Sequence, residues 1–516
     1  MKQAGPTQSG IVYEVPSRRA QRPQNHALAA CAQAGASDFD IVVVGGGGSG
    51  LATALAAASG EARVALIEKN TKLGGTTGLS IGSITASGTS LQRSAGIDDS
   101  PDAHFADFDL FAKPEGAVDN LAFRRLYVDH VADTLHWLMS LGIVFHGPSP
   151  EAPHTRPRMH NVLPHAGAYI HCLASACRAR GVDIRVETAA RGLVEEAGRV
   201  VGVEVDSSRG RGVLRARKGV VLTTGDYSAG TELLRQLAGG RYAAIGALNT
   251  TSTGDGHTLA RALGAQVLNG HVVEGPQMRF AAPREFNWVK QLPPTRLVGQ
   301  AVRWAMATLP RAVLQPVIKM YLTAHLQPTT KLFDAGAILV NRQGLRFSNE
   351  RASPAFDIPG QEGGYGYIVF DGTIGARFER WPDFMSTAPG IAYAYLSDYR
   401  RYRRDIYRDA QTIETLARSL GVPEDALAKS VDTAPVPFSR PPYCALGPLY
   451  SWLMTTDGGL AVTPKFEVLH RDGRAIPGLY AAGIAGQGGV LLPGHGQHLG
   501  WAFTSGRLCG LELGRL

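Results

Sequence analysis

The sequence is poor in cysteine and contains no long apolar run. Its five cysteines (Cys31, Cys172, Cys177, Cys444 and Cys509) form no C-x-x-C pair and no C-x-x-C-H motif. These absences argue against a disulfide framework, a haem attachment site and an iron–sulfur ligand set, and they favour a reducing cytoplasm. Because no stretch of about 18 apolar residues is present, we expect no membrane-spanning segment.

Basic residues outnumber acidic ones but do not cluster as they do in nucleic-acid-binding proteins. There are 52 Lys and Arg against 44 Asp and Glu, a formal net charge of +8. We therefore expect no nucleic-acid partner, whereas anionic cofactors, acidic substrates and acidic membrane surfaces suit the charge. A chain of 516 residues, 44% hydrophobic and 19% charged, is long enough for two or three globular domains.

The strongest local pattern is a strand, a glycine-rich loop, a helix and a second strand that ends in an acid. The β-branched run Asp40–Val44 predicts a buried parallel strand, and Gly45–Gly50 follows it directly. Leu51–Ala58 predicts the helix, and Arg63–Ile67 predicts the second strand, which ends in Glu68.

The glycine spacing G-x-G-x-x-G indicates what this unit binds. Gly45 permits the tight turn, Gly47 lets the backbone approach a pyrophosphate, and Gly50 lets helix and strand pack closely. The helix N-terminus offers N–H groups and the positive end of its dipole to the phosphates. Glu68 is placed to accept hydrogen bonds from an adenosine ribose, so the unit predicts a dinucleotide site.

Three further segments end in turns rich in glycine and hydroxyl residues: Leu73–Thr85, Gly219–Asp226 and Ile476–Gly483. In this order they resemble the FAD-binding fold of the fumarate reductase and succinate dehydrogenase flavoprotein family, which includes the 3-ketosteroid Δ1-dehydrogenases. The resemblance rests on the stretches E-K-x-x-x-x-G-G-T-T, T-T-G and G-L-Y-A-A-G, and it covers most of residues 39–260 and 445–516.

The resemblance implies an α/β fold, with a Rossmann-like FAD-binding domain and an inserted α+β capping domain. The implied boundaries are residues 1–37 for an N-terminal arm, 38–275 and 441–516 for the two parts of the FAD-binding domain, and 276–440 for the capping domain. Substrate is expected between the cap and the flavin, since ligand sites favour domain interfaces.

The resemblance also implies FAD as the cofactor, held non-covalently because Gly74–Ser80 contains no histidine. The cofactor-binding residues that it implies are Gly45, Gly47, Gly48, Ser49, Gly50, Glu68, Lys69, Gly74, Gly75, Thr76, Thr77, Ser80, Gly82, Ala190, Thr224, Gly225, Gly483, Gln497, His498 and Leu499.

The substrate-binding positions depart from both branches of this family. Fumarate reductases grip two carboxylates with two histidines and an arginine, and the matching positions here are Arg279, Thr455 and Pro493. Arg279 is still suited to bind one anionic group. The steroid-dehydrogenase branch has Y-P-G-P-G in its last loop, and this chain keeps the P-G-x-G frame but has Leu492 in place of the tyrosine.

Gly496 is expected to donate its N–H to a carbonyl oxygen and so stabilise a developing enolate. His495 and His498 are candidates for general acid/base chemistry because imidazole titrates near neutral pH, although histidines in such a loop also serve to satisfy backbone groups. Arg351 follows the stretch V-N-x-x-G-x-R-F-x-N-E, near which the family places its proton-donating arginine, or it pairs with a nearby acid. Further candidates are Tyr365, Tyr367 and His160.

No metal site is expected. Four histidines lie between His154 and His171, but their spacing matches no zinc pattern, and Pro157 and Pro164 interrupt any shared helix face.

The segment Trp288–Leu332 mixes many apolar residues with Lys and Arg, and only Glu285 nearby opposes these charges. It predicts either a basic amphipathic surface, which rests on lipid or shelters an apolar substrate, or an ordinary core-facing helical pair interrupted by Pro310 and Pro316. We favour the helical pair.

Together these features predict an FAD-dependent oxidoreductase that interconverts C–C single and double bonds next to a carbonyl, by hydride transfer to flavin N5. A hydrophobic ketone or ring compound, such as a 3-ketosteroid, is the expected substrate. The alternatives are a fumarate-reductase-like reductase of an unsaturated acid, using Arg279 and Arg351, and a non-catalytic flavoprotein. Electrons are expected to pass to an external acceptor, in the cytoplasm or at the inner face of the membrane.

Overall fold

The computed structural model describes residues 39–283, 288–325, 327–388 and 392–516. The predicted arm at residues 1–37, which includes Cys31, lies outside the described residues, as does Glu285. The other four cysteines are free thiols.

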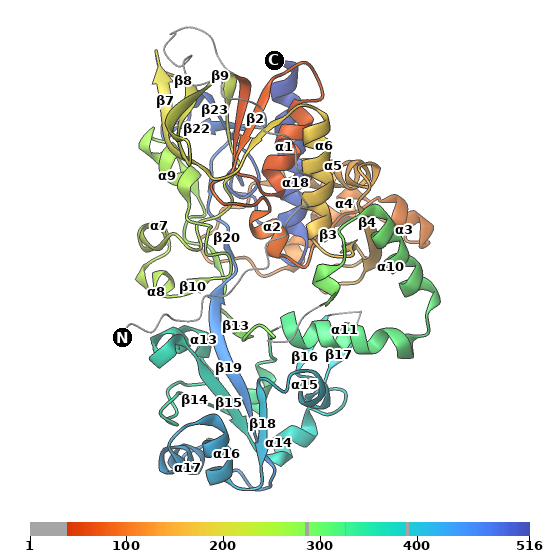
Figure 1. Ribbon diagram of the computed structural model, residues 1–516, viewed down its shortest axis with the longest axis vertical. Coiled ribbons are helices and arrows are strands. Elements are labelled where there is room, and N and C mark those ends of the chain that lie inside the picture. Colours follow the sequence, from red (N-terminus) through yellow and green to blue (C-terminus); the bar gives the residue numbers. More distant parts are fainter. Residues whose placement is uncertain (1–38, 284–287, 326, 389–391) are drawn as a thin grey trace.

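A large twisted sheet forms the centre of the first of two structural units (Figure 1). In spatial order its strands are β22 (Glu467–Leu469), β23 (Ala475–Ala481), β9 (Gly210–Leu222), β1 (Phe39–Val44), β2 (Val64–Ile67) and β6 (Asp183–Arg185). All pairs along this path are parallel except β22 with β23. Ile41, Val42 and Val43 are fully buried, as expected for a parallel strand covered on both faces.

Two antiparallel strands, β7 (Thr188–Glu196) and β8 (Arg199–Ser207), extend this sheet from β9. Four helices gather on one side of it (Figure 1). They are α1 (Gly48–Ala57), α5 (Leu121–Ser140), α6 (Gly167–Ala179) and α18 (Gln497–Arg515). Helices α1 and α18 approach closely because glycines lie at their contact: a Cβ at Gly510 would overlap the Thr53 carbonyl.

A small sheet lies beside the first turn of α18. It consists of β3 (Ser83–Thr85), β5 (Met159–Leu163) and β4 (Val144–Ser149), all antiparallel. The Thr85 N–H donates to the Gly496 carbonyl at 3.3 Å, and the Thr85 hydroxyl donates to the His495 carbonyl at 2.7 Å. The chain before α18 is thereby fixed against β3.

The second unit contains a six-stranded sheet in which β19 (Tyr443–Leu453) is the central strand. Its other strands are β10 (Gly246–Ala247), β13 (Gln277–Phe280), β14 (Ile338–Val340), β15 (Gly366–Phe370) and β18 (Tyr407–Ala410). Strand β19 begins after residue 440, the predicted end of the cap, so this sheet combines strands from both sides of that position. The domain boundaries themselves stay predictions.

Helices cover this sheet and connect it to the first unit. They include α14 (Gly372–Arg377), α15 (Leu396–Tyr402), α16 (Ile413–Leu420) and α17 (Glu424–Asp432). Helix α10 (Arg296–Thr308) packs on the small sheet of the first unit, whereas α11 (Arg311–His325) packs on the second unit near α15 (Figure 1). Within the described residues, no helix is long and apolar enough to cross a bilayer.

Candidate active site

The glycine-rich loop between β1 and α1 has the geometry of a phosphate cradle. A Cβ at Gly45, whose φ is +110°, would lie 2.5 Å from the Thr223 carbonyl oxygen, and a Cβ at Gly50 would overlap the Gly45 carbonyl. A Cβ at Gly47 would meet only the Gly74 carbonyl oxygen, at 3.9 Å. Packing within the protein therefore explains two of these glycines, while the space beside Gly47 fits a pyrophosphate.

Glu68 is held at the end of β2 and faces this loop. Its Oε2 accepts the Gly46 N–H at 2.8 Å, and its Oε1 accepts the Asn70 backbone N–H at 2.9 Å and the Asn70 side-chain amide at 2.7 Å. A carboxylate has about four acceptor sites, so capacity is left for one ribose hydroxyl. Strand β7 also begins next to Glu68, since the N–H of its first residue, Thr188, donates to the Glu68 carbonyl at 2.9 Å. Ala190, another predicted cofactor residue, is the third residue of this strand.

Two hydroxyls in the cradle are buried without a hydrogen-bond partner among the described residues, namely those of Ser49 and Thr224. Unpaired buried hydroxyls are costly, and they fit a polar cofactor such as FAD. Gly225, which has a φ of +76°, has no atom within 4 Å of the place where a Cβ would stand. Gly483 packs directly on Ser49, since its Cβ would come within 2.7 Å of that side chain.

Helix α2 (Gly75–Leu79) closes the cradle from the far side. The Gly48 N–H donates to the Thr77 hydroxyl at 3.2 Å, and the Thr76 hydroxyl accepts from Asn249 at 2.9 Å. Other predicted cofactor residues of this region make contacts within the protein. Gly74 forms a β-bridge with Gly47, and Lys69 forms an ion pair with Asp255. The Ser80 hydroxyl donates to the Thr77 carbonyl, and Gly82 packs on Val162. Of the predicted cofactor residues, the structure thus joins Gly47 with Gly74 and Gly48 with Thr77, and it places Glu68 on the same loop through Gly46.

Gly496 begins α18 in a left-handed conformation, with a φ of +82°. A Cβ there would come within 2.8 Å of the Thr85 nitrogen and hydroxyl. No described residue accepts a hydrogen bond from the Gly496 N–H. The first turn of α18, with Gln497, His498 and Leu499, therefore presents its N–H groups and positive dipole end at this point.

His498 forms an ion pair with Asp457. The Nε2 atom of His498 lies 2.7 Å from the Asp457 carboxylate, and the imidazole is 24% exposed. Burial alone would lower the pKa of His498, but the negative charge of Asp457, its hydrogen bond and the more distant Glu274 and Asp226 outweigh burial and raise the pKa to about 9. His498 is consequently an imidazolium at neutral pH.

His495 makes a second histidine–carboxylate pair in the same loop. The Glu151 carboxylate contacts Nδ1 of His495 and also accepts the His495 backbone N–H at 2.9 Å. The hydrogen bond that the His495 imidazole donates to Glu151 raises the pKa of His495 despite opposing desolvation; the charge of Glu274 raises this pKa further, and the charge of Arg279 lowers it. Arg279 lies on β13, where its guanidinium donates to the Gln277 side chain at 3.1 Å.

A buried polar cluster that the sequence did not predict lies beneath this loop. Gln497, which is fully buried, places its side-chain amide 3.2 Å from His104 Nε2 and 3.4 Å from His154 Nε2. His154 in turn contacts Arg158, whose guanidinium pairs with Asp99 and Asp107. The residues lie far apart in the chain, so no local pattern signals the cluster.

The other predicted site residues do not join this group. Arg351 is exposed, and its guanidinium donates to the Asp334 carbonyl at 3.3 Å. His160 is fully buried in β5, with Nε2 3.0 Å from the Thr89 hydroxyl, and burial lowers its pKa to about 4. Tyr365 and Tyr367 contact each other edge to face in the second unit, with ring centroids 5.7 Å apart.

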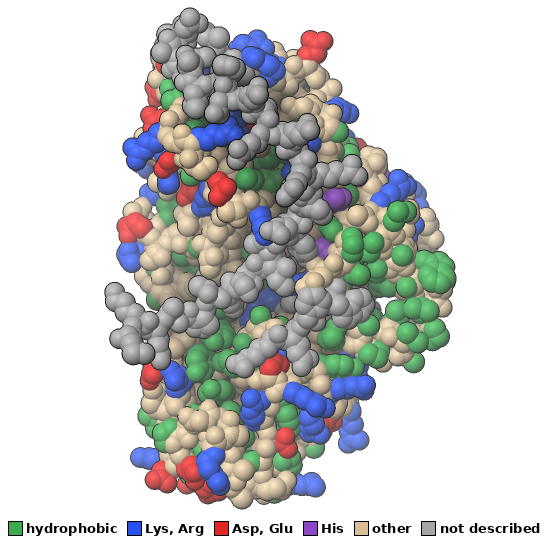
Figure 2. All heavy atoms as spheres, in the orientation of Figure 1, with side chains coloured by type: hydrophobic (Ala, Val, Ile, Leu, Met, Phe, Trp, Pro, Cys, Tyr) green, Lys and Arg blue, Asp and Glu red, His purple; other side chains and the backbone are tan. Residues whose placement is uncertain are grey.

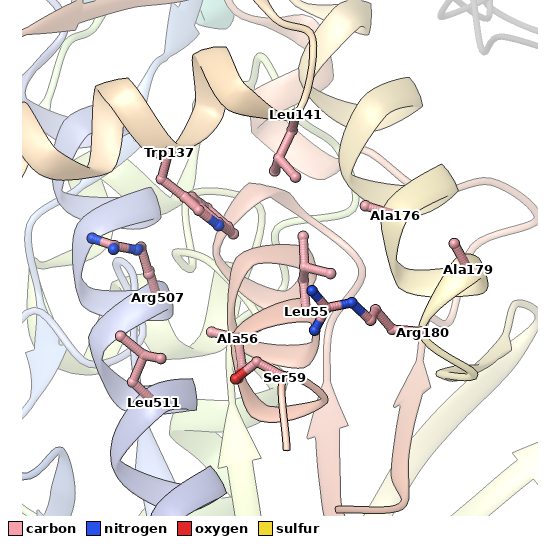
Figure 3. A pocket seen from close by; sticks show the side chains of 10 residues that line it. All are labelled: Leu55, Ala56, Ser59, Trp137, Leu141, Ala176, Ala179, Arg180, Arg507 and Leu511. Atoms are coloured by element: carbon pink, nitrogen blue, oxygen red, sulfur yellow. The ribbon is translucent and has the colours of Figure 1, made fainter. Parts of the chain in front are cut away.

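A cavity of about 330 Å³ opens beside the first turn of α18. Its lining includes Phe108, Phe111, Glu274, Asp457 and His498. A second cavity, of about 340 Å³, lies at the opposite end of α1, where Leu55 and Trp137 point into the same space (Figure 3). Of the candidate site residues, His498 lines the first cavity, and none lines the second.

Comparisons with known proteins agree with this geometry. A model of the FAD binding domain family matches residues 40–285 and 296–491. A probable fumarate reductase of Shewanella frigidimarina is 26% identical over 460 residues, covering 83% of this chain and 66% of the relative. The fumarate reductase (cytochrome) of Shewanella frigidimarina is 26% identical over 515 residues, covering 95% of this chain and 80% of the relative. The chain thus spans just under two thirds of the first relative and more of the second.

Solved structures show the same fold. The open conformation of a flavocytochrome c3 fumarate reductase matches with a TM-score of 0.69 at 23% identity, over 92% of this chain and 78% of that one. A 3-ketosteroid Δ4-(5α)-dehydrogenase from Rhodococcus jostii RHA1 matches with a TM-score of 0.58 at 23% identity, over 94% of this chain and 99% of that one. The predicted α/β fold with an FAD-binding unit is confirmed. The chain is similar to fumarate reductases, and it belongs to the FAD binding domain family as an oxidoreductase whose cofactor is FAD.

Proposed function

We propose that this FAD-dependent oxidoreductase interconverts a C–C single and double bond next to a carbonyl, in a ketone or ring compound. FAD, when bound, supplies the hydride acceptor and donor for such a reaction. The residues suggested for its binding, Gly47, Ser49, Glu68 and Thr224 among them, converge on the cradle described above.

One observation carries the choice of substrate. Of the three positions that match the dicarboxylate clamp, Thr455 and Pro493 carry no charge, and only Arg279 is cationic. Thr455 is also 8% exposed and lies in β20 (Thr455–Thr456), paired with β12 (Val273–Glu274). Binding two carboxylates requires charge-assisted hydrogen bonds to both groups. A ketone requires hydrogen-bond donors to one oxygen atom only, which these three positions do not exclude.

The first turn of α18 supplies such donors. The Gly496 N–H and the His498 imidazolium stabilise negative charge that develops on a carbonyl oxygen, because both are fixed in place before substrate arrives. The raised pKa values of His495 and His498 favour a role as proton donors over a role as bases at neutral pH. When the substrate is oxidised, electrons pass to an external acceptor; when it is reduced, they come from an external donor.

A reductase of an unsaturated carboxylic acid is the second candidate. Arg279 favours it, since this cation acts on His495 electrostatically and is suited to hold one carboxylate. The fumarate reductase relatives point the same way. In this alternative Arg351 takes no part, because its contacts lie with Asn349 and Asp334 on the surface.

Anaerobic titration of the purified flavoprotein tests both candidates. Oxidised protein is mixed with saturated ketones, and photoreduced protein with enones, with fumarate and with an unsaturated monocarboxylate, while flavin absorbance is followed. The proposal expects changes with ketones and enones only. If only the unsaturated acids reoxidise the reduced flavin, the protein is a reductase of unsaturated carboxylic acids. If no compound changes the flavin absorbance, the protein is a non-catalytic flavoprotein.

A further inference from the structure

The hairpin formed by α10 and α11 exposes an unusual amount of apolar surface. Leu297 is 78% exposed, Trp304 is 65% exposed and Val313 is 55% exposed. On α10, positions 297, 301 and 304 are spaced so that they share one helix face. Figure 2 shows hydrophobic side chains gathered on the projection that α10 and the start of α11 form in Figure 1.

The opposite face of α10 is already occupied. Gly299 is buried against the small sheet, where a Cβ would come within 2.9 Å of the Leu163 carbonyl oxygen and 3.1 Å of Val144. The exposed stripe is therefore not the face that binds α10 to the protein. A helix that is apolar on two sides needs a second apolar partner.

The charge of the hairpin has one sign. From Trp288 to Phe333 the sequence contains no Asp or Glu, whereas it contains several Lys and Arg. Arg296 and Arg303 are exposed, and neither has an ion-pair partner among the described residues. Lys319, by contrast, pairs with Asp398 at 3.0 Å and faces the second unit.

We propose that the α10–α11 hairpin docks on an anionic lipid bilayer. Leu297, Trp304 and Val313 would enter the boundary between headgroups and acyl chains, where a tryptophan is favoured, while Arg296 and Arg303 meet the lipid phosphates. A bilayer suits this surface better than a protein partner does, because it offers both an apolar layer and negative charge without demanding acidic residues in return. The sequence analysis favoured an ordinary helical pair, and the exposed stripe is the reason to prefer the lipid-facing alternative.

Vesicle sedimentation with the full flavin-loaded chain tests the proposal. Vesicles of phosphatidylcholine mixed with phosphatidylglycerol are compared with vesicles of phosphatidylcholine alone. The chain is expected to bind the mixed vesicles, to bind less at high salt and to show a blue-shifted tryptophan fluorescence when bound. The double variant Leu297→Ser/Trp304→Ser is expected to lose about tenfold or more in partitioning. Arg296→Gln/Arg303→Gln is expected to remove most of the preference for phosphatidylglycerol.

Trp381→Ser is the matched control, since Trp381 is 62% exposed in the second unit but lies between Glu379 and Asp383. Its binding should equal that of the unchanged chain. Absence of binding to mixed vesicles, or equal binding by the Leu297→Ser/Trp304→Ser variant, would overturn the proposal. So would a lipid-free oligomer that the same double variant dissociates, because the surface would then be a contact between copies of the chain. Flavin absorbance reports that each variant is folded.

Discussion

At the scale of single residues, the charge state of His498 depends on one carboxylate. Asp457 opposes the burial of His498 and keeps its pKa near 9. Replacing Asp457 with Asn removes the nearest negative charge and its hydrogen bond and leaves only the more distant Glu274 and Asp226 to oppose burial, so the pKa of His498 is expected to fall. Histidine NMR titration of the flavin-loaded protein measures this shift, and activity above neutral pH should fall with it.

The same pair makes stability depend on pH. The folded-state pKa of His498 lies above its ordinary value, so the stabilisation is complete below about pH 6.5 and is lost as the pH rises through about 9. This stabilisation amounts to at most about 3 kcal/mol.

Asp472→Asn is the control for the Asp457→Asn variant, because Asp472 pairs with a different histidine, His470, on the surface at 3.0 Å. An unshifted His498 in the Asp457→Asn variant would contradict the assignment.

Gly47 and Gly50 distinguish cofactor binding from folding. Gly47→Ala adds a Cβ in open space at a φ of −77°, which alanine adopts readily. The apoprotein should unfold at the same urea concentration as the unchanged chain, while FAD affinity falls by roughly tenfold or more because the methyl occupies the phosphate position. Fluorescence titration with FAD measures the affinity.

Gly50→Ala supplies the contrasting result. Its Cβ would overlap the Gly45 carbonyl, so α1 cannot stay against β1. We expect a loss of roughly 3 kcal/mol or more of the free energy of unfolding, or no soluble protein at all. Equal loss of stability in both glycine variants would show that the space beside Gly47 is not reserved for a ligand.

At the scale of elements, α18 is positioned by the residue that precedes it. Gly496→Ala is expected to destabilise the protein in two ways: alanine rarely adopts a φ of +82°, and its Cβ would lie 2.8 Å from Thr85. In Gly473→Ala only the backbone strain applies, since Gly473 has a φ of +86° and no atom lies within 4 Å of the position of its Cβ. The first variant should therefore be less stable than the second by roughly 1–3 kcal/mol in urea unfolding. Equal midpoints would mean that β3 does not fix the start of α18.

The sequence predicted the features whose residues lie close together in the chain, and it did not predict those that join distant residues. Strand β1, helix α1, strand β2 and Glu68 lie within thirty residues or so, and their glycine spacing alone indicates the cradle. Strand β19 is different, because its partners β10, β13, β15 and β18 are scattered along the chain before it. The pair of His495 and Glu151 likewise joins distant positions, so the histidines were recognised but their carboxylate partners were not.

At the scale of the whole molecule, the α10–α11 hairpin links the two units. Helix α10 packs on β4 and β5 of the first unit, while Ile318 and Leu322 of α11 pack into the core of the second unit. A helix pair anchored at both ends restricts how far the units move apart.

Gly299→Leu is expected to release one end of this link. The larger side chain cannot fit against Leu163 and Val144, so α10 should detach from the small sheet at a cost of roughly 1–3 kcal/mol. Hydrogen exchange should rise in α10 and β4, while flavin content stays the same because the cradle is untouched. Gly360→Leu, at an exposed position with no atom within 4 Å, is the control. Unchanged exchange in α10 would show that the hairpin is held by the second unit alone, and the two units would then be free to separate without breaking it.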